Sequence, residues 1–132
     1  HGENQAPNRV GQSVDQAIDV NGIVSVDPTA HASLAKYAAY APQTGHNIPD
    51  LFWSYLQKMQ VDYGFDWTFV MGYPISEAYW TQMRVNGQDM PVMIQAYQRR
   101  VLTYTPSFAE GWQVEMGNVG QHYFEWRYEL NK

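Results

Sequence analysis

Apolar and polar residues alternate most clearly in residues 79–105, with the period of two that is typical of β-strands. Asn86-Gly87 divides this stretch, and both residues tolerate the positive φ that a type I′ hairpin turn requires. A third β-rich run, residues 101–105, follows the charged step at Arg99-Arg100. The pattern therefore predicts a central hairpin in which Met83 and Val85 lie against Met90 and Val92.

A period of three to four residues predicts helices before and after this hairpin. Residues 49–60 open with a proline and carry an apolar stripe, and residues 29–40 follow Asp27-Pro28, which is typical of a helix start. Residues 114–129 predict the last helix, although Gly117 and Gly120 weaken it by roughly 1 kcal/mol each. The two longer apolar faces consist of Leu51, Phe52, Tyr55, Leu56 and Met59, and of Met116, Val119, Tyr123, Trp126 and Leu130.

The amino-terminal residues 1–16 are polar and have too few apolar side chains to offset the entropy of ordering them. Residues 17–26 predict one strand, or two short strands separated at Asn21-Gly22. We therefore expect an arm over residues 1–30, which carries this strand, and a single globular module over residues 31–132. A strand that finds no partner in its own domain is a natural donor to a neighbour's sheet edge. Self-assembly of this kind would run through Ile18, Val20, Ile23, Val24 and Val26.

Together these elements predict an α+β fold: a small antiparallel sheet centred on the 79–105 hairpin, covered by two or three helices, with an extended amino-terminal arm. A chain of 132 residues forms one domain with a core of its own. Aromatic residues make up 15% of the chain, more than such a core requires. Some rings are therefore expected at the surface, where they can stack on a partner.

Charge and cysteine content limit the classes of partner and site that the protein can have. The chain has 8 Lys and Arg against 13 Asp and Glu, and this net charge of −5 argues against nucleic acid, whose phosphates require a basic surface. The absence of cysteine excludes disulfides and thiolate metal sites. No apolar run approaches the ~20 residues that span a bilayer. The chain starts with His1 instead of Met, which indicates that it is processed or trimmed. Removal of a signal peptide is the plainest explanation and a trimmed boundary is equally compatible; we expect a secreted or cell-surface protein.

Several motifs between about residues 40 and 128 resemble a module common in secreted proteins of Chloroflexota bacteria. They are Thr44-Gly45-His46, the FWSY and GYPISE segments at residues 52–55 and 72–77, and QAYQRR at residues 95–100 with the VLTYTP and GWQVEMGNVGQHY stretches after it. The GYPISE turn is also similar to the LGFP repeats of actinobacterial cell-wall-associated proteins. The module has no established activity, so the resemblance implies an extracellular location and a non-catalytic accessory role. The family pattern has Glu where this chain has Gln98, so an ion pair made by that Glu would be absent here.

Exposed aromatic rings are the leading candidates for a binding site, because a flat ring can stack on a sugar. The alternative for each ring is burial in the core, and we expect at least three of the five tryptophans to be buried. His46 could hold a ligand, or it could organise the loop that enters the helix at residues 49–60. The predicted binding residues are Trp53, Tyr73, Trp80, Trp112 and His46.

Catalysis finds little support in the sequence. Acid–base chemistry needs a positioned pair of carboxylates, whereas the acidic residues occur singly, and the GxSxG, P-loop and GxGxxG motifs are absent. A free amino-terminal His1 would chelate copper if a second histidine joined it, but HxH and HxxxH spacings are absent. The remaining histidines are His31, His46 and His122. We expect neither an enzyme nor a cofactor, with copper binding through His1 as a remote alternative.

Two functions follow from the sequence. In the first, the protein is a non-catalytic extracellular structural or adhesive surface module that assembles with other copies of itself by donating its amino-terminal strand. In the second, it is a glycan- or peptidoglycan-binding module whose exposed aromatic residues contact a cell-envelope polymer.

Overall fold

The computed structural model describes residues 5–19, 21–26 and 34–118 of the chain. This part is mostly β, with eight strands in two sheets and only two helices, so the predicted α+β fold with a helix-covered sheet is wrong. The elements are β1 (Gln16–Ile18), β2 (Val24–Val26), β3 (Tyr37–Ala41), β4 (His46–Pro49), α1 (Asp50–Tyr63), α2 (Trp67–Met71), β5 (Tyr79–Val85), β6 (Gln88–Ala96), β7 (Arg100–Tyr104) and β8 (Val114–Asn118).

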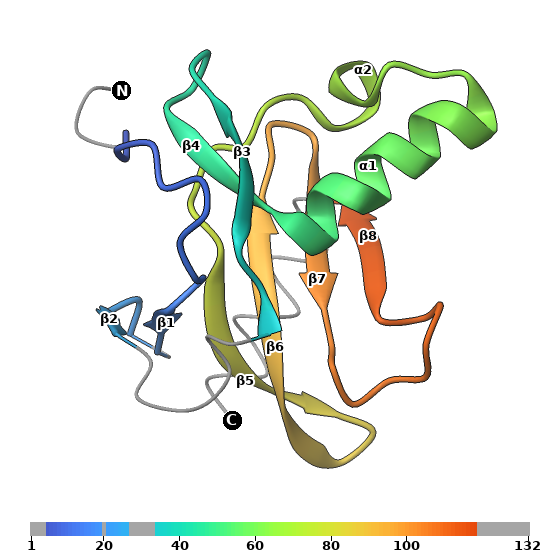
Figure 1. Ribbon diagram of the computed structural model, residues 1–132. Coiled ribbons are helices and arrows are strands. Elements are labelled where there is room, and N and C mark those ends of the chain that lie inside the picture. The colour runs from blue at the N-terminus through green and yellow to red at the C-terminus, as the bar shows by residue number, and fades with distance from the viewer. Residues whose placement is uncertain (1–4, 20, 27–33, 119–132) are drawn as a thin grey trace.

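The larger sheet has six strands in the order β2-β1-β5-β6-β7-β8, so β2 and β8 are its edges. All neighbours are antiparallel except β1 and β5, which pair in parallel where Ala17 meets Trp80. Figure 1 shows α1 crossing the sheet on its β7–β8 side. The two-stranded β3–β4 sheet packs on the same face, and the main core lies between these layers.

The predicted hairpin is confirmed. β5 pairs with β6 around a two-residue turn, and both turn residues have positive φ, 51° at Asn86 and 81° at Gly87. Met83 lies opposite Met90 as predicted, while Val92 lies opposite Thr81. The third predicted strand is also present as β7, which pairs with β6. Local turn chemistry was sufficient here because Asn-Gly fixes both the position of the turn and the register.

The helix predicted at residues 49–60 is confirmed as α1. It begins after Pro49 and ends at Gly64, whose φ of 72° lets its N–H reach the Gln60 carbonyl. Phe52 and Leu56 on its inner face are fully buried against the sheet. Burying a side chain of this size contributes about 1.5–3 kcal/mol. The sheet presents Trp80, Met93 and Leu102 to them.

The helix predicted at residues 29–40 is wrong where the structure describes it. Residues 37–41 form β3, and its partner is β4. Ala35 and Tyr37 are buried while Lys36 and Ala38 are exposed, so this run has the period of two that marks a half-buried strand. Alanine is the strongest intrinsic helix former, but propensity is readily overridden by tertiary context, and here pairing with β4 outweighs it.

The helix predicted at residues 114–129 is also wrong over its first five residues. They form β8, which pairs with β7 from Val114 opposite Tyr104 to Asn118 opposite Arg100. In this short run, apolar residues 114 and 116 flank Glu115, a spacing that fits a strand as well as a helix. Hydrogen bonding to the neighbouring β7 makes this run a strand. The rest of the predicted helix lies outside the described residues.

Residues 17–26 form two short strands, β1 and β2, separated by a turn as one of the two interpretations predicted. The Asp19 carboxylate accepts the N–H groups of Asn21 and Ile23 in this turn. β1 pairs with β5 of its own domain, so residues 16–18 are not an extended arm. Val14, just before them, is fully buried. Val20 lies outside the described residues.

Candidate functional site

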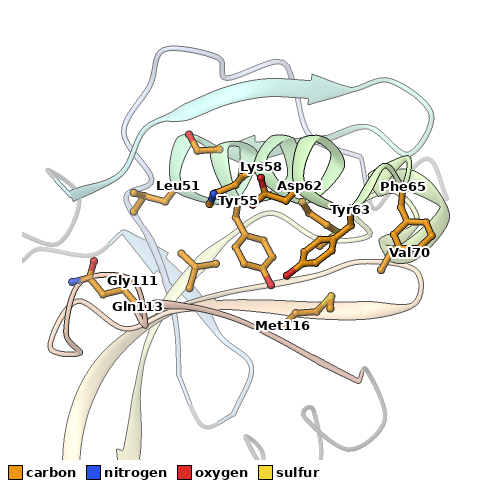
Figure 2. A pocket seen from close by; sticks show the side chains of 13 residues that line it. Leu51, Tyr55, Lys58, Asp62, Tyr63, Phe65, Val70, Gly111, Gln113 and Met116 are labelled. Atoms are coloured by element: carbon orange, nitrogen blue, oxygen red, sulfur yellow. Dashed lines mark ion pairs between the residues drawn. The ribbon is translucent and has the colours of Figure 1, made fainter.

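A groove of about 740 Å³ runs between α1 and β8. Figure 2 shows the rings of Tyr55 and Tyr63 extending from α1, with Met116 of β8 below them and Phe65 and Val70 at one end. Gly111 and Gln113 lie at the other end. The full lining consists of Leu51, Ser54, Tyr55, Lys58, Met59, Asp62, Tyr63, Phe65, Val70, Gly111, Gln113, Val114 and Met116.

The wall on α1 follows from the spacing of its residues. Leu51, Tyr55, Met59 and Tyr63 recur every fourth residue, so each lies one turn beyond the last in a row that winds slowly around the helix. This row lies beside the buried row of Phe52 and Leu56, so the apolar stripe of α1 is wider than the sheet beneath it covers. The excess width provides the aromatic wall of the groove.

The opposite wall follows from the register of β8. Val114 lies opposite Tyr104 and Met116 opposite Leu102, and both partners belong to the core beneath α1. Residues directly opposite each other in an antiparallel pair point to the same face of a sheet. Val114 and Met116 therefore face α1, and the groove has an aliphatic floor.

Polar groups lie along the α1 side of the groove. Lys58 Nζ and Asp62 Oδ2 are 2.8 Å apart, one turn from each other, and this hydrogen bond raises the pKa of Lys58. Burial, followed by the neighbouring Tyr63 and the negative charge of Glu115, raises the pKa of Tyr55. Tyr55 is therefore a neutral phenol at physiological pH, available as a hydrogen-bond donor.

The predicted aromatic residues do not gather in this groove. Trp80 is only 1% exposed and its indole N–H donates to the Val14 carbonyl, so it is a core residue without a free stacking face. Trp53 and Tyr73 are half-buried and pack edge-on against Trp67, at 5.8 and 6.0 Å between ring centroids. Trp112 is 74% exposed and lies between two groove residues in the sequence, Gly111 and Gln113.

His46 belongs to a buried hydrogen-bond network. Its Nδ1 lies 3.1 Å from Glu77 Oε2, and because a carboxylate oxygen accepts, Nδ1 is the donor. The same carboxylate accepts the backbone N–H of Asn47 at 2.8 Å and its side-chain Nδ2 at 2.9 Å. His46 is buried at the start of β4, the strand that leads directly into α1, so its hydrogen bond is a structural contact between β4 and the GYPISE turn. The Thr44-Gly45-His46 and GYPISE motifs thus meet in the interior.

A third motif, QAYQRR at residues 95–100, holds the GYPISE turn in place. Gln98 Oε1 accepts the N–H of Tyr73 at 3.0 Å, and the Gln98 N–H donates to the Tyr73 carbonyl. A Cβ at Gly72 would lie 2.5 Å from the Gln98 Cβ, so the close approach requires glycine there. Arg99 Nε donates to the Phe69 carbonyl at the end of α2. These motif residues hold loops together and do not line the groove.

Neither a cluster of metal ligands nor a membrane-spanning helix occurs in residues 5–19, 21–26 and 34–118. This part of the chain contains no cluster of three or more metal-ligating His, Cys, Asp or Glu side chains. His1, His31 and His122, three of the four histidines considered for copper, lie outside it. Neither of the two described helices has the length and hydrophobicity required to traverse a bilayer.

The groove was missed by sequence reasoning, although one signal for it was present. Leu51, Tyr55 and Met59 of the predicted apolar stripe do line the groove, but nothing local indicated that β8 would lie beside them. The part of the chain that the structure describes is a mostly β domain with an open apolar groove beside its edge strand β8. Comparisons with protein-family models, curated proteins and solved structures found no match for this chain.

Proposed function

We propose that this protein is a non-catalytic binding module and that the groove between α1 and β8 is its working surface. The observation that carries the proposal is the 740 Å³ groove walled by Tyr55, Tyr63, Val114 and Met116. Ligand sites are typically concave, mainly apolar and provided with a few polar groups that fix orientation. Ser54, Lys58, Asp62 and Gln113 provide those groups here.

The polar residues of the groove support binding and give no sign of a reaction centre. Asp62 is the only carboxylate in the lining, and its partner Lys58 is mostly solvent-exposed. An acid–base pair would require positioned groups whose pKa values are shifted toward physiological pH, whereas the hydrogen bond to Asp62 raises the pKa of Lys58 away from it. The Tyr55 phenol is shifted away from physiological pH, which suits a neutral hydrogen-bonding role.

An uncharged fluorescent dye, Nile red, tests the groove directly. We expect the protein to bind the dye with increased fluorescence, and Met116→Lys to weaken binding by about tenfold because a charge in the groove must be desolvated. Val61→Lys is the matched control, since Val61 is on α1 and 82% exposed but does not line the groove. Equal binding by both variants would show that the dye binds elsewhere and would contradict the proposal.

An extracellular, adhesive setting is part of this proposal. It is supported by the motifs that resemble the secreted Chloroflexota module. Two of them, Thr44-Gly45-His46 and GYPISE, meet at His46 and Glu77. The FWSY and GWQVEMGNVGQHY segments contribute groove residues: Ser54, Tyr55, Gly111, Gln113, Val114 and Met116. A binding module of this kind attaches its cell to a partner through a surface groove. Fractionation of the native source into cytosol, envelope and medium tests the setting, and recovery of the protein in the cytosol alone would contradict it.

Glycan binding is a second candidate function because of Trp112. Its exposed ring follows Gly111 at one end of the groove, and an exposed indole can stack on a sugar. We expect retention of the protein on insoluble peptidoglycan, chitin or cellulose, and loss of retention in Trp112→Ala. Unchanged retention in that variant would remove Trp112 from the candidate site.

A further inference from the structure

We infer that the ligand of the groove is an extended polypeptide segment of another molecule, which adds as a strand to the outer edge of β8 and places apolar side chains against α1. This inference rests on the proposed function of the groove and names its ligand class. It combines three features: the outward backbone of β8, the length of the groove and the charge around it.

The backbone of β8 alternates between its two sides. The Thr105 N–H donates to the Gln113 carbonyl at 2.9 Å, so Gln113 faces the β7 side. In an antiparallel ladder, residues bonded to the partner alternate with residues whose N–H and C=O point away. Val114 and Met116 therefore direct their backbone groups to the outer edge, and within the described residues β7 is the sole strand neighbour of β8.

The same two residues face the groove with their side chains. A strand that pairs with their outward N–H and C=O groups in antiparallel register would point its own opposing side chains to the same face. Those side chains would enter the groove beside Tyr55 and Tyr63. Backbone pairing would thus supply affinity while the groove selects alternate side chains, as in peptide recognition by strand addition.

The groove has the length of a short strand. Its α1 wall runs from Leu51 to Tyr63, which is about 18 Å at the rise of an α-helix. An extended chain covers this distance with about five or six residues. The five residues of β8 match that length. A peptide of this size would therefore fill the groove along its whole wall.

The charges beside the groove favour a basic partner. Lys58 is paired with Asp62, which leaves their sum neutral. Glu110 and Glu115 are exposed next to the lining residues Gly111 and Val114. Two copies paired along β8 would bring their Glu110 and Glu115 side chains close together, which opposes a second copy at this edge. The complementary segment has apolar residues at alternate positions and Lys or Arg at its ends.

The test uses a synthetic seven-residue peptide in which valine and threonine alternate between terminal lysines. Two versions carry N-methyl groups, one on every valine amide and the other on every threonine amide. In a bound strand the two sets of N–H groups point to opposite sides, so only one set reaches β8. We expect the valine-methylated peptide to bind at least about tenfold more weakly than the threonine-methylated one.

Variants of the protein locate the peptide. We expect Met116→Lys to abolish binding and Glu115→Lys to weaken it about threefold at low salt, with the latter loss disappearing at high salt. Asp89→Lys, at the distant hairpin tip, is the charge-matched control and should bind as the unmodified protein does. Titrations followed by calorimetry give each affinity.

The outcomes separate the two proposals. Equal binding by the two methylated peptides would overturn strand addition and leave the groove intact as a binding site. Binding of Nile red without binding of any peptide at millimolar concentration would overturn the peptide class alone. Failure to bind both Nile red and the peptides would overturn the groove as a binding site. If the protein is a dimer and Met116→Lys converts it to a monomer, a second copy occupies the edge. If soluble peptidoglycan fragments displace the dye and the peptide does not, the ligand is a glycan.

Discussion

Glu77 joins segments of chain that are far apart in the sequence. Its side chain is buried and its two oxygens satisfy His46 and both amide groups of Asn47. Asn47 in turn donates to the Pro7 carbonyl and accepts from the Arg9 N–H, so the network reaches the amino-terminal segment. Arg9 Nε adds an ion-pair contact with Glu77 Oε1 at 3.7 Å. One carboxylate thus connects β4, the GYPISE turn and residues 7–9.

Glu77→Ala should therefore destabilise the fold strongly. It would leave three buried donors without an acceptor, and we expect a loss of about 3 kcal/mol in the free energy of unfolding. Glu110→Ala, in an exposed loop, is the control and should change it by less than about 0.5 kcal/mol. Urea denaturation measures both, and similar midpoints for the two variants would contradict the role given to Glu77.

Gly87→Val tests the hairpin turn. A Cβ at Gly87 would meet no atom within 4 Å, so its cost comes from the φ of 81° alone. A β-branched residue is strained there, and we expect a loss of about 1–3 kcal/mol. Gly87→Asn is the matched control, because asparagine tolerates this region, and it should lose less. An equal melting temperature for Gly87→Val and the unmodified protein would contradict the turn assignment.

At the scale of elements, the sequence predicted those whose signals are local. The β5–β6 hairpin has its Asn86-Gly87 turn, and α1 has its proline, its stripe and Gly64. β3 and β8 were predicted as helices because each is five residues long and acquires its identity from a partner, β4 or β7. The groove could not be predicted for the same reason, since it requires β8 beside α1.

The edge strand β2 carries the remaining self-assembly hypothesis. Ile23, Val24 and Val26 are exposed there, and an exposed apolar edge is a template for pairing with another chain. Ile18 instead packs beside Ile94 and Val101 on the sheet face away from α1. Self-assembly would therefore add a strand to β2 without removing β1 from β5.

Val26→Lys should abolish association through this edge. Val26 is 67% exposed, so the change is expected to leave the fold intact while placing a charge at the pairing surface. We expect the unmodified protein to associate with increasing concentration in sedimentation velocity, and the variant to remain monomeric. Val61→Lys, a similarly exposed valine on α1, should associate normally. A monomeric unmodified protein at millimolar concentration would refute self-assembly by β2.

At the scale of the whole molecule, buried tyrosines determine the response to alkali. Burial raises the pKa of Tyr37 and of Tyr97 well above the usual value of 10.0, and Glu77 raises that of Tyr37 further. The unfolded chain then loses these protons at lower pH than the folded chain does. The free energy of unfolding therefore keeps its full value below about pH 10. Above that pH it decreases by up to about 1.4 kcal/mol per pH unit for each tyrosine.

We therefore expect the melting temperature to be nearly constant from pH 8 to 9.5 and to fall steeply above pH 10. Tyr37→Phe removes one titrating group and should reduce the steepness, even though it also lowers stability at pH 8 by losing hydrogen bonds to Ala78. Tyr63→Phe, at an exposed position, should leave the slope unchanged. Equal slopes for both variants would contradict the assignment of the alkaline transition to buried tyrosine.

The parallel pairing of β1 with β5 has a consequence for the order in which the molecule is completed. Ala17 meets Trp80, and the Trp80 indole binds the Val14 carbonyl 66 positions earlier in the chain. The β5–β6–β7 meander can form through short loops, whereas this contact must close a long one. A ribosome makes residues 14–18 well before their partner exists. We therefore expect β1, the first described strand to be synthesised, to be among the last to pair. Until then its backbone N–H and C=O groups can pair with other chains.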